Sequence, residues 1–115
     1  MKMNVAQIAA AVGGTLVTTA MPEAGADFGY ASDLLSDVMG HVGEGAVLIT
    51  IQNHLNTIAV CTLAGISVIV ICHARPIPDD MLAAANREHV AIVTTPLSQF
   101  ACSVALAALP PSVRS

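Results

Sequence analysis

The sequence predicts an α/β fold, a single small domain with a mainly parallel central sheet and flanking helices. Three observations favour this fold. The chain has 115 residues, a length that suits one domain. After Gly45 it alternates three times between a β-branched run and a helical segment, which favours right-handed crossovers between parallel strands. The β-branched runs are apolar at successive positions, as is typical of parallel strands covered on both faces.

The segment before Gly45 predicts shorter elements. Asn4 is a suitable cap, and Gly13–Gly14 a suitable end, for a helix with the apolar positions Val5, Ile8, Ala9 and Val12. Thr15–Thr18 is rich in β-favouring residues and predicts a short strand. Met21–Gly29 contains Pro, Gly and Asp, and predicts a loop that leads into another short strand.

A brief helix is predicted over Asp33–Met39, with Ser32 as its cap and Gly40 as its end. Asp33, Asp37 and His41 are spaced at i, i+4 and i+8. On one continuous helix they would share a face and offer a metal two carboxylates and an imidazole. Because Gly40 interrupts the helix before His41, we expect no metal site.

Three strand–helix units follow. The predicted strands are Val47–Gln52, Ser67–Cys72 and Val90–Thr94. Asn53 is a suitable cap for the first helix, whose apolar face is predicted to be Leu55, Ile58, Ala59, Thr62 and Leu63.

The remaining helix ends follow from local chemistry. Gly65 ends the first of these helices. The second is predicted over Asp79–Glu88, with acids in its first turn and Arg87 in its last, as the helix dipole favours. The third is predicted over Leu97–Leu109, with Thr95 as its cap.

Composition limits the classes of function. Charged residues make up 10% of the chain, against about 25% in an average soluble domain, and the net charge is −4. The four basic residues are scattered, which excludes an electrostatic surface for nucleic acid: Lys2, Arg75, Arg87 and Arg114. So few charges leave apolar surface exposed on a monomer, and we expect a homodimer or a higher homo-oligomer.

The apolar runs are far shorter than the roughly 18 residues that a membrane-spanning helix needs. The three cysteines, Cys61, Cys72 and Cys102, lie in apolar runs without a C-x-x-C pair. We therefore expect reduced core thiols in a cytoplasmic protein. Because neighbours on a strand point to opposite faces, Cys72 and His73 are not expected to form a nucleophile–base pair.

The familiar catalytic signatures are missing from the sequence. It contains no P-loop, no G-x-G-x-x-G and no G-x-S-x-G. We therefore expect no cofactor and no catalytic residues, and favour a protein that is not an enzyme.

Polar residues follow the predicted parallel strands, where ligands bind in open α/β sheets. We predict that Thr50, Gln52, Asn53 and His54 line such a cleft, together with Arg75 and Thr95. A simpler interpretation stays open: Asn53 and Thr95 only cap helices, and His54 and His73 are solvated.

Four segments carry a resemblance to a known family: Gly29–Met39, Leu48–His54, Asn56–Val60 and Thr95–Phe100. On the basis of these four segments, the chain resembles a stand-alone DRTGG domain protein over nearly its whole length. This family resembles the amino-terminal domain of bacterial HPr kinase/phosphorylase, without its kinase domain. It is also more distantly similar to the uridine-nucleotide-binding domain of Mur ligases.

The resemblance implies a regulatory role. Family members occur as regulatory inserts in phosphotransacetylases and pyrophosphatases, and free-standing forms occur in anaerobic bacteria near iron-only hydrogenase genes. Tyr30 and Asp33 belong to the most family-like segment and are added on that ground to the predicted ligand site. The family's Asp-Arg pair falls on Glu23 and Ala24, and the first of its two glycines on Phe28, so its arginine is missing here.

Two hypotheses follow. The first is a non-catalytic regulatory or assembly module that oligomerises and binds a small anionic ligand or a partner protein, with a link to hydrogenase or energy metabolism implied by the resemblance. The alternative is a small enzyme that acts on a phosphorylated metabolite or nucleotide in the cleft at the strand ends.

Overall fold

A five-stranded sheet forms the middle layer of the computed structural model, which describes residues 3–110. In spatial order its strands are β2 (Thr15–Leu16), β7 (Ala91–Thr94), β6 (Val68–Ile71), β5 (Ala46–Thr50) and β4 (Phe28–Ala31). Strands β4, β5, β6 and β7 pair in parallel, and β2 pairs antiparallel with β7 at one edge. The predicted α/β fold with a mainly parallel sheet is confirmed.

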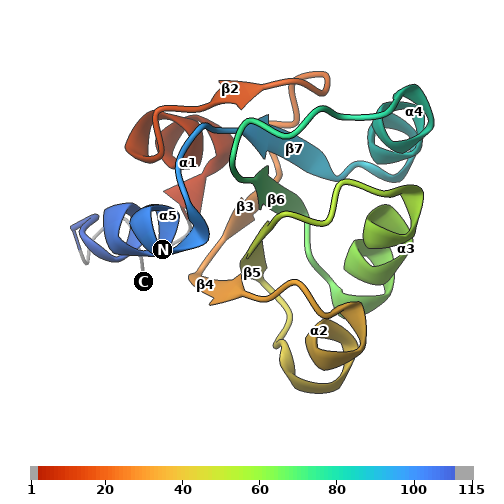
Figure 1. Ribbon diagram of the computed structural model, residues 1–115, viewed down its shortest axis with the longest axis horizontal. Coiled ribbons are helices and arrows are strands. Elements are labelled where there is room, and N and C mark those ends of the chain that lie inside the picture. The colour runs from red at the N-terminus through yellow and green to blue at the C-terminus, as the bar shows by residue number, and fades with distance from the viewer. Residues whose placement is uncertain (1–2, 111–115) are drawn as a thin grey trace.

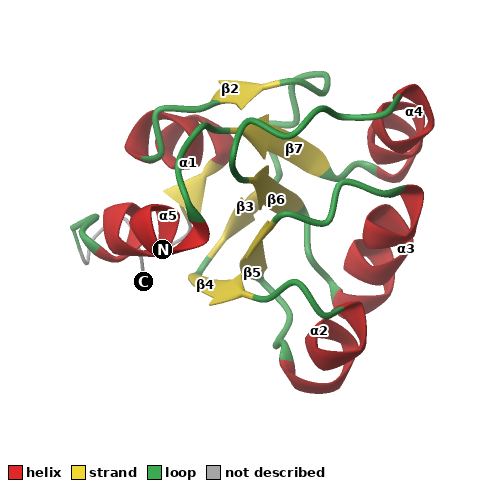
Figure 2. Cartoon of the chain, in the orientation of Figure 1, coloured by secondary structure: helices red, strands yellow, loops and turns green. Residues whose placement is uncertain are grey.

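Helices cover both faces of the sheet (Figure 1). On one face lie α1 (Val5–Ala11) and α5 (Gln99–Ala107). On the other lie α2 (Leu35–His41), α3 (Leu55–Ala64) and α4 (Asp79–Glu88), stacked side by side in Figure 2. A separate two-stranded sheet joins β1 (Met3–Asn4) to β3 (Gly25–Ala26).

The core has one cluster on each face of the sheet. Val47, Val70 and Val93 point toward α1 and α5, while Leu48 and Ile69 point toward α2, α3 and α4. All five of these side chains are fully buried. Burial of both faces explains why the parallel strands consist of apolar runs without alternation.

Two helices lie where the sequence predicts them. Asn4 caps α1 through a capping box, in which its side chain accepts from the Gln7 backbone and the Gln7 side chain accepts from the Asn4 backbone, both at 2.8 Å. Helix α4 has the predicted bounds, with Asp79 and Asp80 in its first turn and Arg87 in its last. Gly65 ends α3 in the left-handed conformation, as predicted.

The prediction for α2 is wrong at both ends. The helix begins at Leu35 and runs through Gly40 to His41. The Ser32 hydroxyl accepts from the Leu34 backbone at 3.2 Å, so it forms a turn before the helix. Asp33 stays outside the helix because its carboxylate is hydrogen-bonded to β5.

The predicted caps of α3 and α5 are also wrong. The residue before α3 is His54, which makes no side-chain cap, and Ser98 caps α5 by accepting from the Ala101 backbone at 3.1 Å. The side chains of Asn53 and Thr95 instead bind distant backbone carbonyls.

The buried face of α3 differs from the predicted one. Leu55 and Leu63 are exposed, and the residues that face the core are Thr57, Ile58 and Cys61. Thr57 is tolerated there because its hydroxyl donates to the Gln52 carbonyl at 2.9 Å.

Strand ends differ from prediction by small amounts. β5 ends at Thr50 and not at Gln52, and β2 covers only the first half of Thr15–Thr18.

Within residues 3–110, no helix is long and apolar enough to cross a membrane. Lys2 and Arg114 lie outside the described residues.

Candidate functional site

Asp33 is the centre of a hydrogen-bond cluster at the carboxyl end of β5. Its Oδ1 accepts three hydrogen bonds of 2.9 Å, from the Thr50 hydroxyl, the Ile51 backbone and the Gln99 side chain. The Gln52 side chain donates to the Asp33 backbone carbonyl at 2.6 Å. Three of the predicted site residues, Asp33, Thr50 and Gln52, are thus brought together.

The charge of Asp33 is stabilised by this cluster. Burial by itself raises the pKa of the carboxyl group, but the hydrogen bonds from Ile51, Gln99 and Thr50 and the charge of Arg75 outweigh it, so the pKa is lowered. Asp33 is therefore ionised near neutral pH, and it connects the loop after β4 to β5 and α5.

Tyr30 belongs to a different cluster. Its hydroxyl donates to Asp37 of α2 at 2.7 Å, and His41 lies 2.9 Å from the other Asp37 oxygen. The hydrogen bond from Tyr30, one from Ser32 and the proximity of His41 lower the pKa of Asp37. Within residues 3–110, no group of three His, Cys, Asp or Glu side chains is placed to hold a metal.

Asn53 ties the loop after β5 to the loop after β6. Its side-chain nitrogen donates to the Pro76 carbonyl at 2.7 Å, and only 8% of the residue is exposed. Its Oδ1 is buried and has no hydrogen-bond partner in the part of the chain that the structure describes. Such an orphaned acceptor is uncommon in a folded protein.

The loop after β6 has an unusual backbone. His73 and Ala74 both lie in the left-handed region, with φ of 59° and 51°. Their N–H groups donate to the carbonyls of Leu97 and Thr95, at 3.0 and 2.8 Å. These bonds, with the one from Asn53, hold the loop in a single shape just before Arg75.

Arg75 lines a groove between β2 and α4, with a volume of about 450 Å³. It is lined by Arg75, Pro76 and Ile77 before α4, by Leu82 within α4, and by Thr15, Val17, Thr94 and Thr95 of the sheet edge. We call this the β2–α4 groove. It brings together Arg75 and Thr95 of the predicted site, but the Thr95 hydroxyl is already engaged with the Val12 carbonyl at 2.7 Å.

Three basic side chains at this edge of the sheet are exposed. His54, His73 and Arg75 are exposed, and none makes a side-chain hydrogen bond or ion pair within residues 3–110. The simpler interpretation from the sequence is therefore correct for the histidines, because His54 and His73 are both solvated. It is wrong for Asn53 and Thr95, which do not cap helices.

The three thiols are fully buried and free. Burial raises the pKa of Cys61 and Cys72 to about 12, and it also raises the pKa of Cys102. The sulfur atoms of Cys72 and Cys102 lie 3.7 Å apart. These thiols are protonated near neutral pH, so they are weak nucleophiles.

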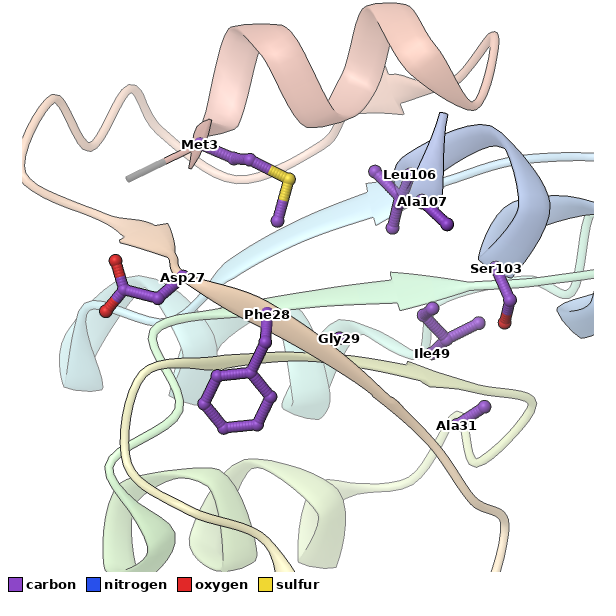
Figure 3. A pocket seen from close by; sticks show the side chains of 9 residues that line it. All are labelled: Met3, Asp27, Phe28, Gly29, Ala31, Ile49, Ser103, Leu106 and Ala107. Atoms are coloured by element: carbon purple, nitrogen blue, oxygen red, sulfur yellow. The ribbon is translucent and has the colours of Figure 1, made fainter. Parts of the chain in front are cut away.

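A second groove lies on the opposite face of the sheet, beside the edge strand β4 (Figure 3). It has a volume of about 510 Å³. Gly29 and Ala31 give it a shallow floor, and Leu106 and Ala107 of α5 form a wall. We call this the β4–α5 groove. Its lining is mainly apolar, with Asp27 as its charged member.

Sequence reasoning missed several residues that complete these sites. Gln99 lies in the family-like segment Thr95–Phe100, but nothing local links it to Asp33, 66 positions away. Thr15 is predicted only as part of a strand, and Thr94 as a polar residue at the end of another strand that is not included in the predicted site. They meet because β2 returns antiparallel to β7, which the sequence pattern did not predict.

Comparison with known proteins supports the fold. No family model and no curated protein matches the chain. Among solved structures, it is similar to the CBS and DRTGG domains of the regulatory region of Clostridium perfringens pyrophosphatase, solved with its activator diadenosine tetraphosphate. The TM-score is 0.73 at 13% identity, over 95% of this chain and 48% of that one. The chain therefore has a fold found in a CBS and DRTGG region, and spans about half its length.

Proposed function

We propose that this protein is a regulatory module of the DRTGG type, which binds a small anionic ligand at the carboxyl ends of its strands and catalyses no reaction. The observation that carries this proposal is the contrast, at that edge of the sheet, between side chains that are hydrogen-bonded to one another and basic side chains that are exposed. Asp33, Thr50 and Gln52 are hydrogen-bonded to one another, while His54, His73 and Arg75 are exposed and make no side-chain hydrogen bond or ion pair within residues 3–110. A fixed framework that presents free basic side chains suits the recognition of an anion.

The similar solved structure supports a regulatory role. That pyrophosphatase region is described as regulatory and binds a nucleotide activator. A nucleotide is an anion, so the ligand class inferred from His54, His73 and Arg75 agrees with it.

The state of the hydroxyl and thiol groups favours binding over catalysis. The hydroxyls of Thr50, Thr57 and Thr95 donate to Asp33, to the Gln52 carbonyl and to the Val12 carbonyl. These hydroxyls hold loops in place. The thiols have pKa values raised by burial, so they are poorly suited to act as nucleophiles.

A thermal-shift screen of nucleotides and phosphorylated metabolites, followed by calorimetry, tests this proposal. We expect at least one anion to raise the melting temperature. Replacing His54, His73 and Arg75 together by glutamine should weaken its binding by roughly tenfold or more, because a hydrogen bond to a charged group is worth about 1.5–3 kcal/mol. His41→Gln is the matched control, since His41 is an exposed histidine on α2, paired with Asp37.

Two results would contradict the proposal. One is a screen in which no anion stabilises the protein. The other is turnover of a phosphorylated compound that His54→Gln abolishes, which would favour the enzyme alternative.

We also propose that the protein self-associates through α5 and β4. Phe100 and Val104 of α5 are 80% and 53% exposed, and α5 carries no charged residue. Phe100, Val104 and Ala107 are spaced at i, i+4 and i+7, so they share one face of α5. Ala107 lines the β4–α5 groove. Within residues 3–110, β4 pairs on one side only, so a second copy of β4 fits its open edge.

Light scattering coupled to gel filtration tests the assembly. We expect a mass of at least twice 11.7 kDa at micromolar concentration. Phe100→Glu should shift the protein toward the monomer, while Leu63→Glu should not, because Leu63 is 74% exposed but lies on α3, on the other face of the sheet. A parent protein of monomeric mass would contradict the proposal.

A further inference from the structure

The β2–α4 groove contains hydrogen-bond donors that the protein itself does not use. Arg75 is one of two arginines within residues 3–110, and the other, Arg87, has its Nε 3.3 Å from Glu88. Arg75 makes no side-chain hydrogen bond or ion pair within the described residues, although its charge acts on Asp33 and helps to lower the pKa of that carboxyl group. Its loop is nevertheless fixed by bonds at His73, Ala74 and Pro76. Binding an acceptor at Arg75 therefore costs side-chain entropy but does not require the loop to be ordered.

Two neighbouring hydroxyls belong to the lining of the groove. Thr15 and Thr94 are direct partners in the antiparallel ladder of β2 and β7, so their side chains are neighbours on one face. Ile92 lies two residues before Thr94, so both side chains point to the same face of the sheet. Ile92 packs in the core cluster that contains residues of α4, so this is the face that α4 covers. Neither hydroxyl makes a hydrogen bond within the described residues, in contrast to the neighbouring Thr95.

The close approach of β2 to β7 depends on Gly14. A Cβ at this position would lie 2.6 Å from the Thr94 carbonyl oxygen, so a larger residue would push the strands apart. The pair of hydroxyls is therefore a product of tight local packing. The groove also lacks an acidic residue in its lining, although the chain as a whole has a net charge of −4.

The donors and the shape of the groove define a class of ligand. A guanidinium offers two parallel N–H groups, and two hydroxyls add one donor each. A guanidinium in the bidentate mode contacts both oxygens of a carboxylate, whereas a phosphoryl group keeps a third terminal oxygen for the two hydroxyls. Beyond the donors, the groove is lined by Val17, Ile77 and Leu82, which suit an apolar group attached to the phosphate.

We propose that the β2–α4 groove binds a phosphate monoester, with Arg75, Thr15 and Thr94 on the phosphoryl group and the organic part against Ile77 and Leu82. This inference rests on the proposed function, since it names the ligand class and the place of its charged group. It adds Thr15 and Thr94 to the site and assigns Asp33 to the framework that supports the edge.

Titration of the ¹⁵N-labelled protein with phenyl phosphate, followed by nuclear magnetic resonance, tests this inference. We expect the largest shift changes at the amides of Thr15, Thr94, Arg75 and Ile77. Benzoate, which has the same ring and a carboxylate, should bind at least tenfold more weakly. Inorganic phosphate should shift the same amides except Ile77, because it lacks the ring.

Variants separate this groove from the rest of the edge. Arg75→Gln should weaken phenyl phosphate at least tenfold, and Thr94→Val by a few-fold at similar side-chain volume. Arg87→Gln is the matched control and should leave binding unchanged, because Arg87 lies outside the groove.

Two outcomes would overturn the inference: unchanged binding in Arg75→Gln, or shift changes centred on residues 52–56. In either case an anion found by the thermal screen would still support the proposed function. If the screen finds no anion and phenyl phosphate causes no shifts, both proposals fail.

Discussion

The side chain of Gln99 donates a hydrogen bond of 2.9 Å to Oδ1 of Asp33, across 66 positions of sequence. It joins the first turn of α5 to the loop after β4. Asp33 also receives donors from Thr50 and Ile51, so one carboxylate oxygen fixes three segments of the chain. This cluster makes the carboxyl edge of the sheet a rigid support for the neighbouring loops.

Replacing Gln99 should loosen that support. Gln99→Met keeps the length of the side chain and removes one hydrogen bond to a charged group at a half-buried position, so we expect a loss of about 1 kcal/mol in the free energy of unfolding. Urea unfolding measures it. Ser103→Ala is the control, because the Ser103 hydroxyl bonds only to the carbonyl of Gln99 within α5 and its loss should be nearly neutral. Equal effects of the two variants would contradict the role given to Gln99.

The ionised form of Asp33 should make the stability depend on pH. Because its pKa is lowered in the folded state, its contribution is fully present above the unfolded pKa of about 3.9 and is lost as the pH falls through the lowered value. Asp33→Asn should therefore destabilise the protein at pH 7, and the difference from the parent should shrink below about pH 4. Urea unfolding at several pH values measures this difference. A gap that stays constant with pH would show that the charge of Asp33 is unimportant.

Tyr30 offers a direct spectroscopic test of the second cluster. The hydrogen bond to Asp37, then partial burial, then the charge of Asp37 raise the pKa of the phenol above its ordinary value of about 10. The chain has one tyrosine and no tryptophan, so its ultraviolet titration reports Tyr30 alone. We expect a midpoint above 10 that falls in Asp37→Asn. The same midpoint in both proteins would rule out the contact.

The thiols should be protected in the folded protein. Burial raises the pKa of Cys61 and Cys72 to about 12, and all three cysteines are fully buried. A thiol reagent at pH 8 should react slowly with the native protein and rapidly with three thiols in urea. Rapid labelling of Cys72 in the native state would contradict its packing against Cys102 of α5.

The parts of the fold that local chemistry determines were predicted well. Helix α4 has the predicted bounds because acids at its start and Arg87 at its end both match the helix dipole. The three apolar strands were recognised because burial on both faces demands continuous apolar runs.

The errors come from bonds between distant residues. Asn53 and Thr95 are good caps by type, but their side chains bind the carbonyls of Pro76 and Val12, which lie 23 and 83 positions away. A short polar side chain can either cap a helix or hydrogen-bond a distant backbone carbonyl, and only the tertiary structure decides which of the two it does. The same limit applies to the candidate site: Arg75 is predicted from its place after a strand, but the pairing of Thr15 with Thr94 in the same groove depends on the antiparallel return of β2.

A crystal structure with the strongest anion from the screen bound would test the central claim most directly, because the two grooves lie on opposite faces of the sheet. We predict that the ligand lies at the carboxyl ends of β5, β6 and β7, within hydrogen-bond distance of Arg75, with its charged group in the β2–α4 groove. A ligand seated in the β4–α5 groove, between Gly29 and Leu106 in Figure 3, would contradict it.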